Sequence, residues 1–171
     1  TLTVDGPGGE ATHSTTVTVY DPPTVSIEAE DEDIAAGGST TLQWTSTHAT
    51  SAFIEGIGPV SVNGSLVVSP LVTTSYEITV TGPGGSATDS VTVRTHPVPT
   101  VSISSDLTTI DPGGSAVLSW TSSNAVTATI NSGIGHVNPV GTITVSPLVT
   151  TTYTIRVEGP GGTASDSVPV S

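Results

Sequence analysis

An internal repeat constrains this chain more than any other feature of its sequence. Residues 24–93 align with residues 100–170, with one extra residue in the second copy, and 39 of the 70 aligned positions are identical. Identity of that extent indicates two copies of one folding unit. A chain of 171 residues has room for two small domains of this size.

The first residues carry part of a third copy. LTVDGPGGEAT at 2–12 matches ITVTGPGGSAT at 78–88, near the end of the first full copy. We therefore expect residues 1–20 to be the C-terminal hairpin of a preceding repeat, with full repeats at 21–95 and 96–171. A two-stranded hairpin is barely stable alone in water. It needs the rest of its own domain, or a neighbouring chain, to cover its apolar face.

Proline-containing joints connect these units. They read YDPPT at 20–24 and THPVPT at 95–100. Proline fixes its own φ and biases the residue before it toward extended geometry. Such linkers are semi-rigid, so the sequence predicts an extended string of domains with restricted bending.

Within each copy, about seven short runs of alternating apolar and polar residues are separated by turn signals. This pattern is typical of a β-sandwich, and the abundance of Val and Thr favours strands over helices. The alternation also argues against a disordered acidic coil. It predicts one large aromatic pair in each core: Trp44 with Tyr76, and Trp120 with Tyr153.

These motifs resemble the bacterial immunoglobulin-like and fibronectin-III-like repeats of large surface proteins and of the tails of secreted enzymes. The resemblance is carried by Trp44 and Trp120, by TTSYEITVTG and TTTYTIRVEG, and by GPGGSATDSVTV and GPGGTASDSVPV. It covers the whole chain and implies an all-β fold of tandem seven-stranded Ig-like β-sandwiches. The core position that holds a cysteine in antibody domains is Ile78 or Ile155 here, so the resemblance is to the disulfide-free branch. Because this fold hosts many roles, the resemblance is specific for fold and not for function.

Charge and composition exclude several classes of function. The net charge is −13 with two strong cations and no cysteine, so nucleic acid and anionic membrane surfaces are poor partners, and neither disulfides nor Cys-based metal sites can form. The four histidines are His13, His48, His96 and His136, and none recurs at an equivalent place in both full copies. We expect surface histidines, no catalytic residues and no enzyme activity.

The GPGG motif recurs at 6–9, 82–85 and 159–162. A glycine-rich loop can cradle phosphate where it leads from a strand into a helix. Here it joins two strands and no lysine follows, so we interpret it as a hairpin turn with positive φ at glycine.

An acidic cluster before residue 34 offers candidate cation ligands in Glu30, Asp31 and Asp33. Calcium prefers six to eight oxygen ligands and could stiffen such a string. The spacing lacks an EF-hand or RTX pattern, however, and the second copy keeps only one acidic position. We favour a solvated acidic loop and no bound cofactor, with calcium as the alternative.

A few further residues attract attention. Asp89 and Asp166 lie on the inward face of the last strand of each copy, where a carboxylate must be hydrogen-bonded, and we expect a structural role for both. Phe53, on an outward position, and Tyr20, at a joint, are candidate contact residues. Asn63-Gly64-Ser65 fits the N-glycosylation pattern, although Asn-Gly is first of all a turn signal.

The sequence favours a structural function: a stalk, spacer or fibre-forming segment of a bacterial surface protein, located outside the cell. Its partners would be other copies of itself or neighbouring repeats. Two alternatives stay open. One is an adhesin module that binds a surface glycan or a protein, and the other is an accessory tail of a secreted hydrolase.

Overall fold

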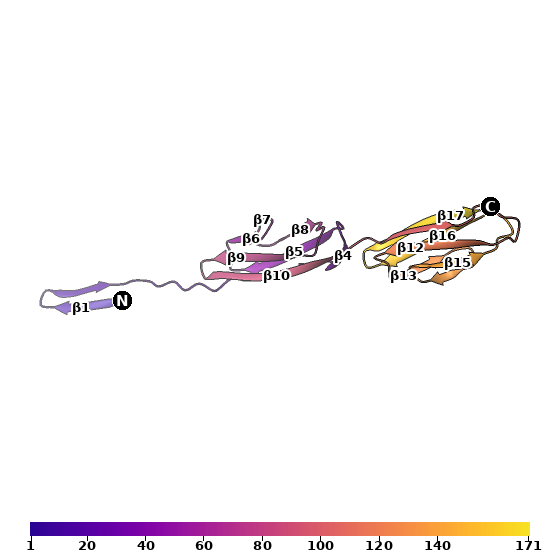
Figure 1. Ribbon diagram of the computed structural model, residues 1–171. Helices are drawn as coiled ribbons and strands as arrows, with labels where there is room; N and C mark the ends of the chain where they lie inside the picture. The colour runs from indigo at the N-terminus through magenta and orange to yellow at the C-terminus, as the bar shows by residue number, and fades with distance from the viewer. The chain divides into compact units, whose positions relative to one another are not determined.

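The computed structural model describes residues 1–171 and contains strands connected by turns and loops (Figure 1). The chain holds no helix that is both long enough and apolar enough to cross a lipid bilayer. The prediction of an all-β fold is confirmed.

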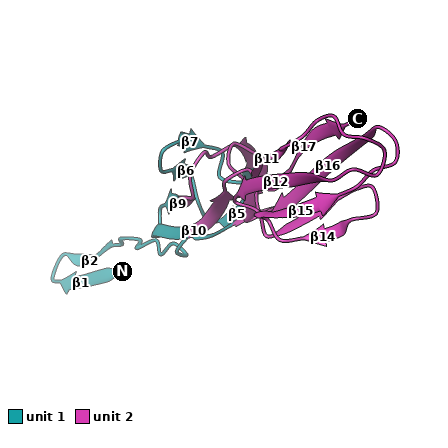
Figure 2. Cartoon of the chain, turned by 45° about the vertical axis from the view of Figure 1, so that its right-hand side comes forward, with its two compact units in different colours: residues 1–27, 44–64, 77–89 teal, residues 28–43, 65–76, 90–171 magenta.

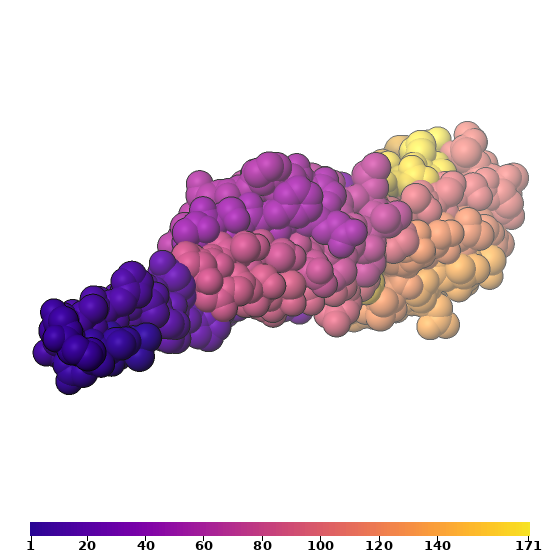
Figure 3. All heavy atoms as spheres, turned by 90° about the vertical axis from the view of Figure 1, so that its left-hand side faces the viewer, coloured from indigo at the N-terminus to yellow at the C-terminus, as the bar shows by residue number.

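The first two strands form a separate hairpin. Strand β1 (Leu2–Gly6) pairs antiparallel with β2 (Gly9–His13). Leu2 is 66% exposed and Val4 is 59% exposed, whereas the aligned residues Ile78 and Val80 of the first full repeat are fully buried. The indigo spheres of Figure 3 include this hairpin. Its apolar face has no cover in this structure.

The first full repeat contains eight strands in two sheets. One sheet has the order β3-β5-β8 and the other the order β4-β10-β9-β6-β7. The strands are β3 (Thr24–Ala29), β4 (Asp33–Ala35), β5 (Thr40–Thr47), β6 (Ser51–Ile54), β7 (Gly58–Val60), β8 (Gly64–Val68), β9 (Thr74–Gly82) and β10 (Gly85–His96).

The second full repeat has the same arrangement with seven strands. Its sheets have the orders β11-β12-β15 and β14-β13-β16-β17. The strands are β11 (Thr100–Ser105), β12 (Ala116–Ser123), β13 (Thr127–Ile130), β14 (Gly135–Val137), β15 (Gly141–Val145), β16 (Thr151–Gly159) and β17 (Gly162–Val170).

Contacts between residues divide the chain into two compact units. One comprises residues 1–27, 44–64 and 77–89, and the other residues 28–43, 65–76 and 90–171 (Figure 2). This division passes through the first full repeat and does not test the domain boundaries 1–20, 21–95 and 96–171, which stay a prediction.

The strand that distinguishes the first repeat is β4. It pairs parallel with β10, and Asp33, Ile34 and Ala35 lie opposite Arg94, Thr95 and His96. The second repeat makes the same connection without an assigned strand there: Ser171 N–H and Ser171 Oγ both donate to the Thr108 carbonyl, and Ile110 N–H donates to the Ser171 carbonyl. In both repeats, a segment near the start of the repeat is therefore hydrogen-bonded to the residues at the end of the same repeat.

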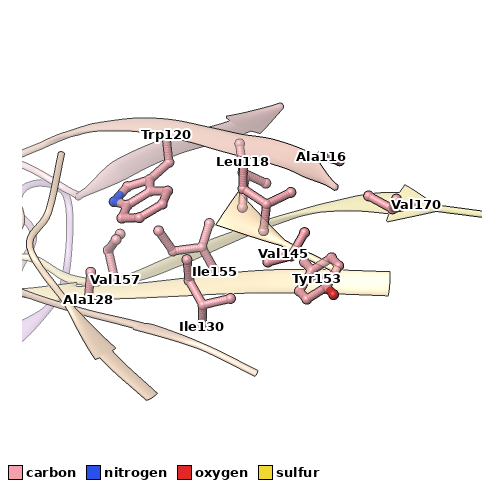
Figure 4. Close-up of a cluster of buried hydrophobic side chains, with 11 residues drawn as sticks. Ala116, Leu118, Trp120, Ala128, Ile130, Val145, Tyr153, Ile155, Val157 and Val170 are labelled. Carbon is pink, nitrogen blue, oxygen red and sulfur yellow. The ribbon is translucent and has the colours of Figure 1, made fainter. Parts of the chain in front are cut away.

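The core of the second repeat lies between its two sheets (Figure 4). Because side chains alternate across a strand, every second residue of β12 and β16 points inward. Strand β8 of the first repeat departs from this regularity, since Leu66 stays 36% exposed. The core cluster of the second repeat consists of Ile103, Ala116, Leu118, Trp120, Ala128, Ile130, Val145, Tyr153, Ile155, Val157 and Val170.

A buried tryptophan anchors each core through its indole nitrogen. Trp44 Nε1 donates to the Ser61 carbonyl at 2.8 Å, and Trp120 Nε1 donates to the Asn138 carbonyl at 2.8 Å. A Cβ at Gly141 would lie 2.9 Å from the Trp120 ring, which is closer than van der Waals contact allows. A glycine facing the ring therefore lets the outer strand approach the tryptophan, whose polar atom is satisfied despite burial.

The inward aspartate of each last strand ties the two sheets together. Asp89 Oδ2 accepts a hydrogen bond from Ile27 N–H at 2.8 Å, and Asp166 Oδ2 accepts one from Ile103 N–H at 2.9 Å. In each case the donor belongs to the first strand of one sheet and the acceptor to the last strand of the other. The carboxylate also occupies a backbone donor on an edge strand, which otherwise could pair with another chain.

Replacing Asp166 with alanine should lower the free energy of unfolding by about 1–3 kcal/mol, because the partly buried Ile103 N–H loses a charged acceptor. Urea unfolding followed by tryptophan fluorescence measures this loss. The matched control is Asp111→Ala, since Asp111 is exposed and contributes its backbone carbonyl to a turn. Equal stability of the two variants would contradict the assigned role.

Tyr76 makes the fold sensitive to alkaline pH. Burial raises the pKa of the Tyr76 hydroxyl above its usual value of 10.0, because the phenolate is poorly solvated inside the core. The unfolded chain therefore releases this proton first. The stability that depends on Tyr76 is present below pH 10.0 and is lost as the pH rises through the raised pKa. Urea midpoints at neutral and alkaline pH should show a smaller alkaline loss in Tyr76→Phe than in the wild-type chain, and an unchanged loss would contradict this.

Candidate functional site: the linker dock

The GPGG motif forms the hairpin that joins the last two strands of each repeat. Proline holds φ near −65°, so it cannot occupy the positive-φ position of a two-residue type I′ turn. The positive φ falls instead on the fourth residue of the motif, which follows the turn and begins the next strand: φ is 118° at Gly9, 127° at Gly85 and 115° at Gly162. The prediction of a hairpin turn with positive φ at glycine is confirmed.

The first glycine of the motif is required for a different reason, namely space. A Cβ on Gly82 would lie 2.0 Å from the His48 carbonyl oxygen, and a Cβ on Gly159 would lie 2.0 Å from the Asn124 carbonyl oxygen. His48 and Asn124 are aligned residues of the loop that follows β5 or β12. Both adopt left-handed backbone conformation, with φ of 55° and 58°, which is uncommon outside glycine. The loop thus turns its carbonyl directly onto the hairpin.

The third glycine meets the proline-containing joint. A Cβ on Gly84 would lie 2.1 Å from the Asp21 carbonyl oxygen, and a Cβ on Gly161 would lie 2.1 Å from the Pro97 carbonyl oxygen. Neither Gly84 nor Gly161 has positive φ, so its backbone would suit any residue. The requirement for glycine at these two positions comes from the backbone of the linker alone.

Side chains of the same loop also reach the linker. His48 Nε2 lies 3.8 Å from Asp21 Oδ2, and Asn124 Nδ2 donates to the Val98 carbonyl at 3.4 Å. Both groups of the histidine pair are mostly exposed, so the pair stabilises little by itself. We call each set of contacts a linker dock: Asp21, His48, Gly82 and Gly84 in the first repeat, and Pro97, Val98, Asn124, Gly159 and Gly161 in the second.

The hairpin β1–β2 carries the same motif without these contacts. A Cβ on Gly6 or Gly8 would meet nothing within 4 Å. The aligned positions Gly82 and Gly84 are both crowded by backbone. The hairpin therefore provides an internal reference for what the GPGG motif tolerates when no linker lies against it.

The candidate cation ligands are not brought together. Asp33 Oδ1 lies 2.8 Å from His96 Nε2, and Asp33 Oδ2 lies 4.0 Å from Arg94 Nη1. Arg94 also faces Glu32, while Glu30 and Asp31 use their backbone N–H groups to bond Thr41 and Thr40. No group of three His, Cys, Asp or Glu side chains is placed to hold a metal ion. The side chains of Arg94 and His96 lie where a metal would need Asp33.

The remaining candidate residues are dispersed over the surface. Phe53 on β6 is 50% exposed, and Tyr20 in the first linker is 56% exposed. His13 and His136 are exposed on β2 and β14. Trp44, Tyr76, Trp120 and Tyr153 are all at least 92% buried. The structure therefore buries the four aromatic residues expected in the cores and leaves Phe53 and Tyr20 on the surface.

Sequence reasoning did not find the linker dock. It attributed the GPGG motif to positive φ, which explains only the last of its three glycines. The available signal was that the first and third glycines recur although a hairpin turn does not need them. The contacts that they make join residues more than thirty positions apart, and no local pattern in the sequence indicates such contacts.

Comparison with known proteins supports the fold. No protein-family model matches the chain, and no curated protein matches it. The solved I67–I69 fragment of the titin I-band is similar, with a TM-score of 0.56 and 14% identity, over 88% of this chain and 65% of that one. An E-to-A variant of I67–I69 gives a TM-score of 0.55 and 13% identity, over 86% of this chain and 64% of that one.

The chain thus spans less than two thirds of the length of either titin structure. A third structure, the mouse nectin-like molecule 4 ectodomain (Ig1–Ig3), aligns at 14% identity over 84% of this chain and 62% of its own, with a TM-score of 0.38 that is too low to bear on the fold. At these identities the similarity shows the fold alone. The chain is a tandem array of immunoglobulin-like β-sandwiches.

Replacing Gly161 with alanine should displace the linker from the second repeat, because the added methyl group would overlap the Pro97 carbonyl. We expect a stability loss of about 1–3 kcal/mol. Urea unfolding measures it. The matched control is Gly8→Ala, in which the same motif position has open space. A stability loss in Gly161→Ala no larger than that in Gly8→Ala would contradict the dock.

Proposed function

We propose that this chain is a non-enzymatic spacer segment of a bacterial surface protein, located outside the cell, in which docked linkers limit bending at the joints. The observation that carries the proposal is the recurrence of the linker dock in both full repeats. Two copies that differ at 31 of 70 aligned positions keep the same glycines and the same backbone contacts. A joint without a mechanical role would not need contacts of this kind.

The dock acts by removing freedom from the linker. Proline already restricts two of the linker residues, and the hairpin glycines hold the carbonyl of Asp21 or Pro97 against the repeat that follows. Fixing one residue costs roughly 1–2 kcal/mol of conformational entropy, which is spent when the repeat folds. A linker that is ordered in this way restricts the orientation of one repeat relative to the next, whereas a Gly/Ser-rich linker would behave as a random coil.

The path of the chain through the first repeat also suits a segment under tension. Strand β4 lies near the entry of the chain, β10 leads to its exit, and the two strands are parallel. A pull on the two ends therefore slides β4 and β10 past each other along their length. The hydrogen bonds from Arg94 N–H to the Glu32 carbonyl and from Ala36 N–H to the His96 carbonyl then bear load together instead of breaking one by one.

The surface chemistry favours a spacer over an adhesin. The exposed aromatic residues are Tyr20 and Phe53, and the residue aligned with Phe53 is Thr129, so neither repeat presents an aromatic platform for a glycan. The net charge of −13 makes neighbouring molecules repel one another. The bacterial and extracellular assignment rests on the resemblance of the repeat motifs, and the partners that we propose are neighbouring repeats of the same protein.

The distance distribution between two spin labels tests the proposed stiffness. The chain contains no cysteine, so Thr45→Cys and Thr121→Cys place one label on an exposed, aligned position of each repeat. We expect a narrow distribution in double electron–electron resonance, because the docked linker restricts motion between the labels.

The control is the same labelled pair in the Gly161→Ala background, in which the distribution should broaden, whereas Gly8→Ala should leave it unchanged. A distribution in the parent pair that is already as broad as in Gly161→Ala would refute the spacer mechanism.

A further inference from the structure

Both full repeats expose the same pair of apolar side chains in the loop before their second-to-last strand. In the first repeat, ahead of β9, Leu71 is 76% exposed and Val72 is 70% exposed. In the second repeat, ahead of β16, Leu148 and Val149 are each 75% exposed. We call each of these a Leu-Val pair. A single exposed apolar residue is ordinary on a protein surface, but this pair occurs twice.

The Leu-Val pair is retained where other exposed apolar residues are not. Within the two aligned copies, every other large apolar residue that is at least 50% exposed aligns with a polar residue. Copies that differ at 31 of 70 aligned positions nevertheless keep both residues of the pair, which indicates a role that the two repeats share. The positions that changed are Phe53 with Thr129, Val67 with Thr144, Val126 with Thr50, and Val140 with Asn63.

Packing inside the repeat leaves most of the pair uncovered. In the first repeat, Gly37 N–H donates to the Pro70 carbonyl at 2.9 Å. The aligned bond in the second repeat joins Gly113 N–H to the Pro147 carbonyl at 3.0 Å, so the loop is held in the same way in both. A Cβ on Gly37 would lie 3.3 Å from Leu71 Cδ2, and the leucine therefore contacts the glycine turn with one end only. The rest of its surface is available to a partner outside its own repeat.

The pair of the first repeat lies beside the joint at 95–100. Thr95 N–H donates to Thr73 Oγ1 at 3.1 Å, and Thr73 directly follows Val72 in the chain. Val98 is three residues beyond Thr95, so the chain can carry it no further than about 11 Å from Thr95. The length of the joint therefore keeps Val98 within reach of the pair.

The residues on the other side of this joint are also apolar and exposed. Val98 is 50% exposed and Val126 is 68% exposed. Asn124 Nδ2 donates to the Val98 carbonyl in the linker dock, and Val126 follows two residues later. The division of the chain by contacts places residues 65–76 and 90–171 in one compact unit (Figure 2). Both sides of the joint thus offer apolar surface within the same unit.

We propose that the Leu-Val pair of the first repeat is an interaction surface whose partner is the second repeat, with Val98 and Val126 packed against it. This contact removes apolar area of both sides from water, which is favourable. A second molecule would have to overcome the repulsion due to a net charge of −13, whereas the joint holds the two sides of one chain at high effective concentration. The inference rests on the proposed spacer function and deepens it, because the contact restrains the joint in addition to the linker dock.

Reaction of single cysteines with an uncharged maleimide tests the contact, because the chain has no cysteine of its own. Leu71→Cys and Leu148→Cys place a thiol in the same loop sequence, but in a protein produced as residues 1–171 only the first has a repeat after it. We expect Leu71→Cys to react more slowly, and a contact formed in about 80–90% of molecules gives a difference of roughly 5–10-fold. Val72→Cys and Val149→Cys repeat the comparison with both leucines intact.

Removing the partner separates the contact from local effects on the thiol. Val98→Ser combined with Val126→Ser should raise the rate of Leu71→Cys to that of Leu148→Cys and leave Leu148→Cys unchanged. Urea unfolding checks that these variants stay folded, as expected for substitutions of exposed valines. Equal rates for Leu71→Cys and Leu148→Cys would overturn the proposal, and so would a slow Leu71→Cys that the valine substitutions do not accelerate. The rates report coverage of the pair and the spin-label distances report stiffness, so failure of the contact and failure of the spacer mechanism are told apart.

Discussion

The rest of this structure depends on close contacts between glycines and backbone carbonyl oxygens. Each oxygen lies where any other residue would have its Cβ. In each full repeat two glycines of the last hairpin leave that space open, one for the loop after the second long strand and one for the incoming linker. Any other residue would push the backbone of its partner away. The constraint is purely steric, so it holds at any pH or salt concentration, unlike the weak exposed pair between His48 and Asp21.

The duplication extends beyond the strands to individual hydrogen bonds. The tryptophan-to-carbonyl bond, the aspartate bond to the first strand and the bond from Gly37 or Gly113 to a proline carbonyl occur in both repeats. The one insertion is absorbed in a turn: Ser132, with φ of 55°, lengthens the connection after β13. Asn131 then secures that turn, since its Oδ1 accepts from Thr154 N–H at 2.8 Å. The copies diverge where a loop can change without disturbing the cores or the docks.

The sequence was sufficient to predict the strands and the sandwich, because alternation and turn residues are local signals that recur in each copy. It was not sufficient for the features that depend on distant backbone. The glycines at 82 and 84 owe their identity to His48 and Asp21, and Asp33 meets His96 across more than sixty residues. The pairing partner of strand β4 is the far end of the repeat, which no local pattern indicates. Local patterns describe which face a residue takes, and tertiary contacts decide which neighbour it meets.

The linker dock also has a consequence for how such a chain matures. It joins the residues that enter a repeat to the hairpin that is made last, so a repeat emerging from the ribosome leaves its leading joint free until its final two strands arrive. Closure of that hairpin completes the sheet and immobilises the joint in the same event. Rigidity therefore advances along the chain one finished repeat at a time, while the part still being threaded keeps the flexibility that passage through a narrow channel requires.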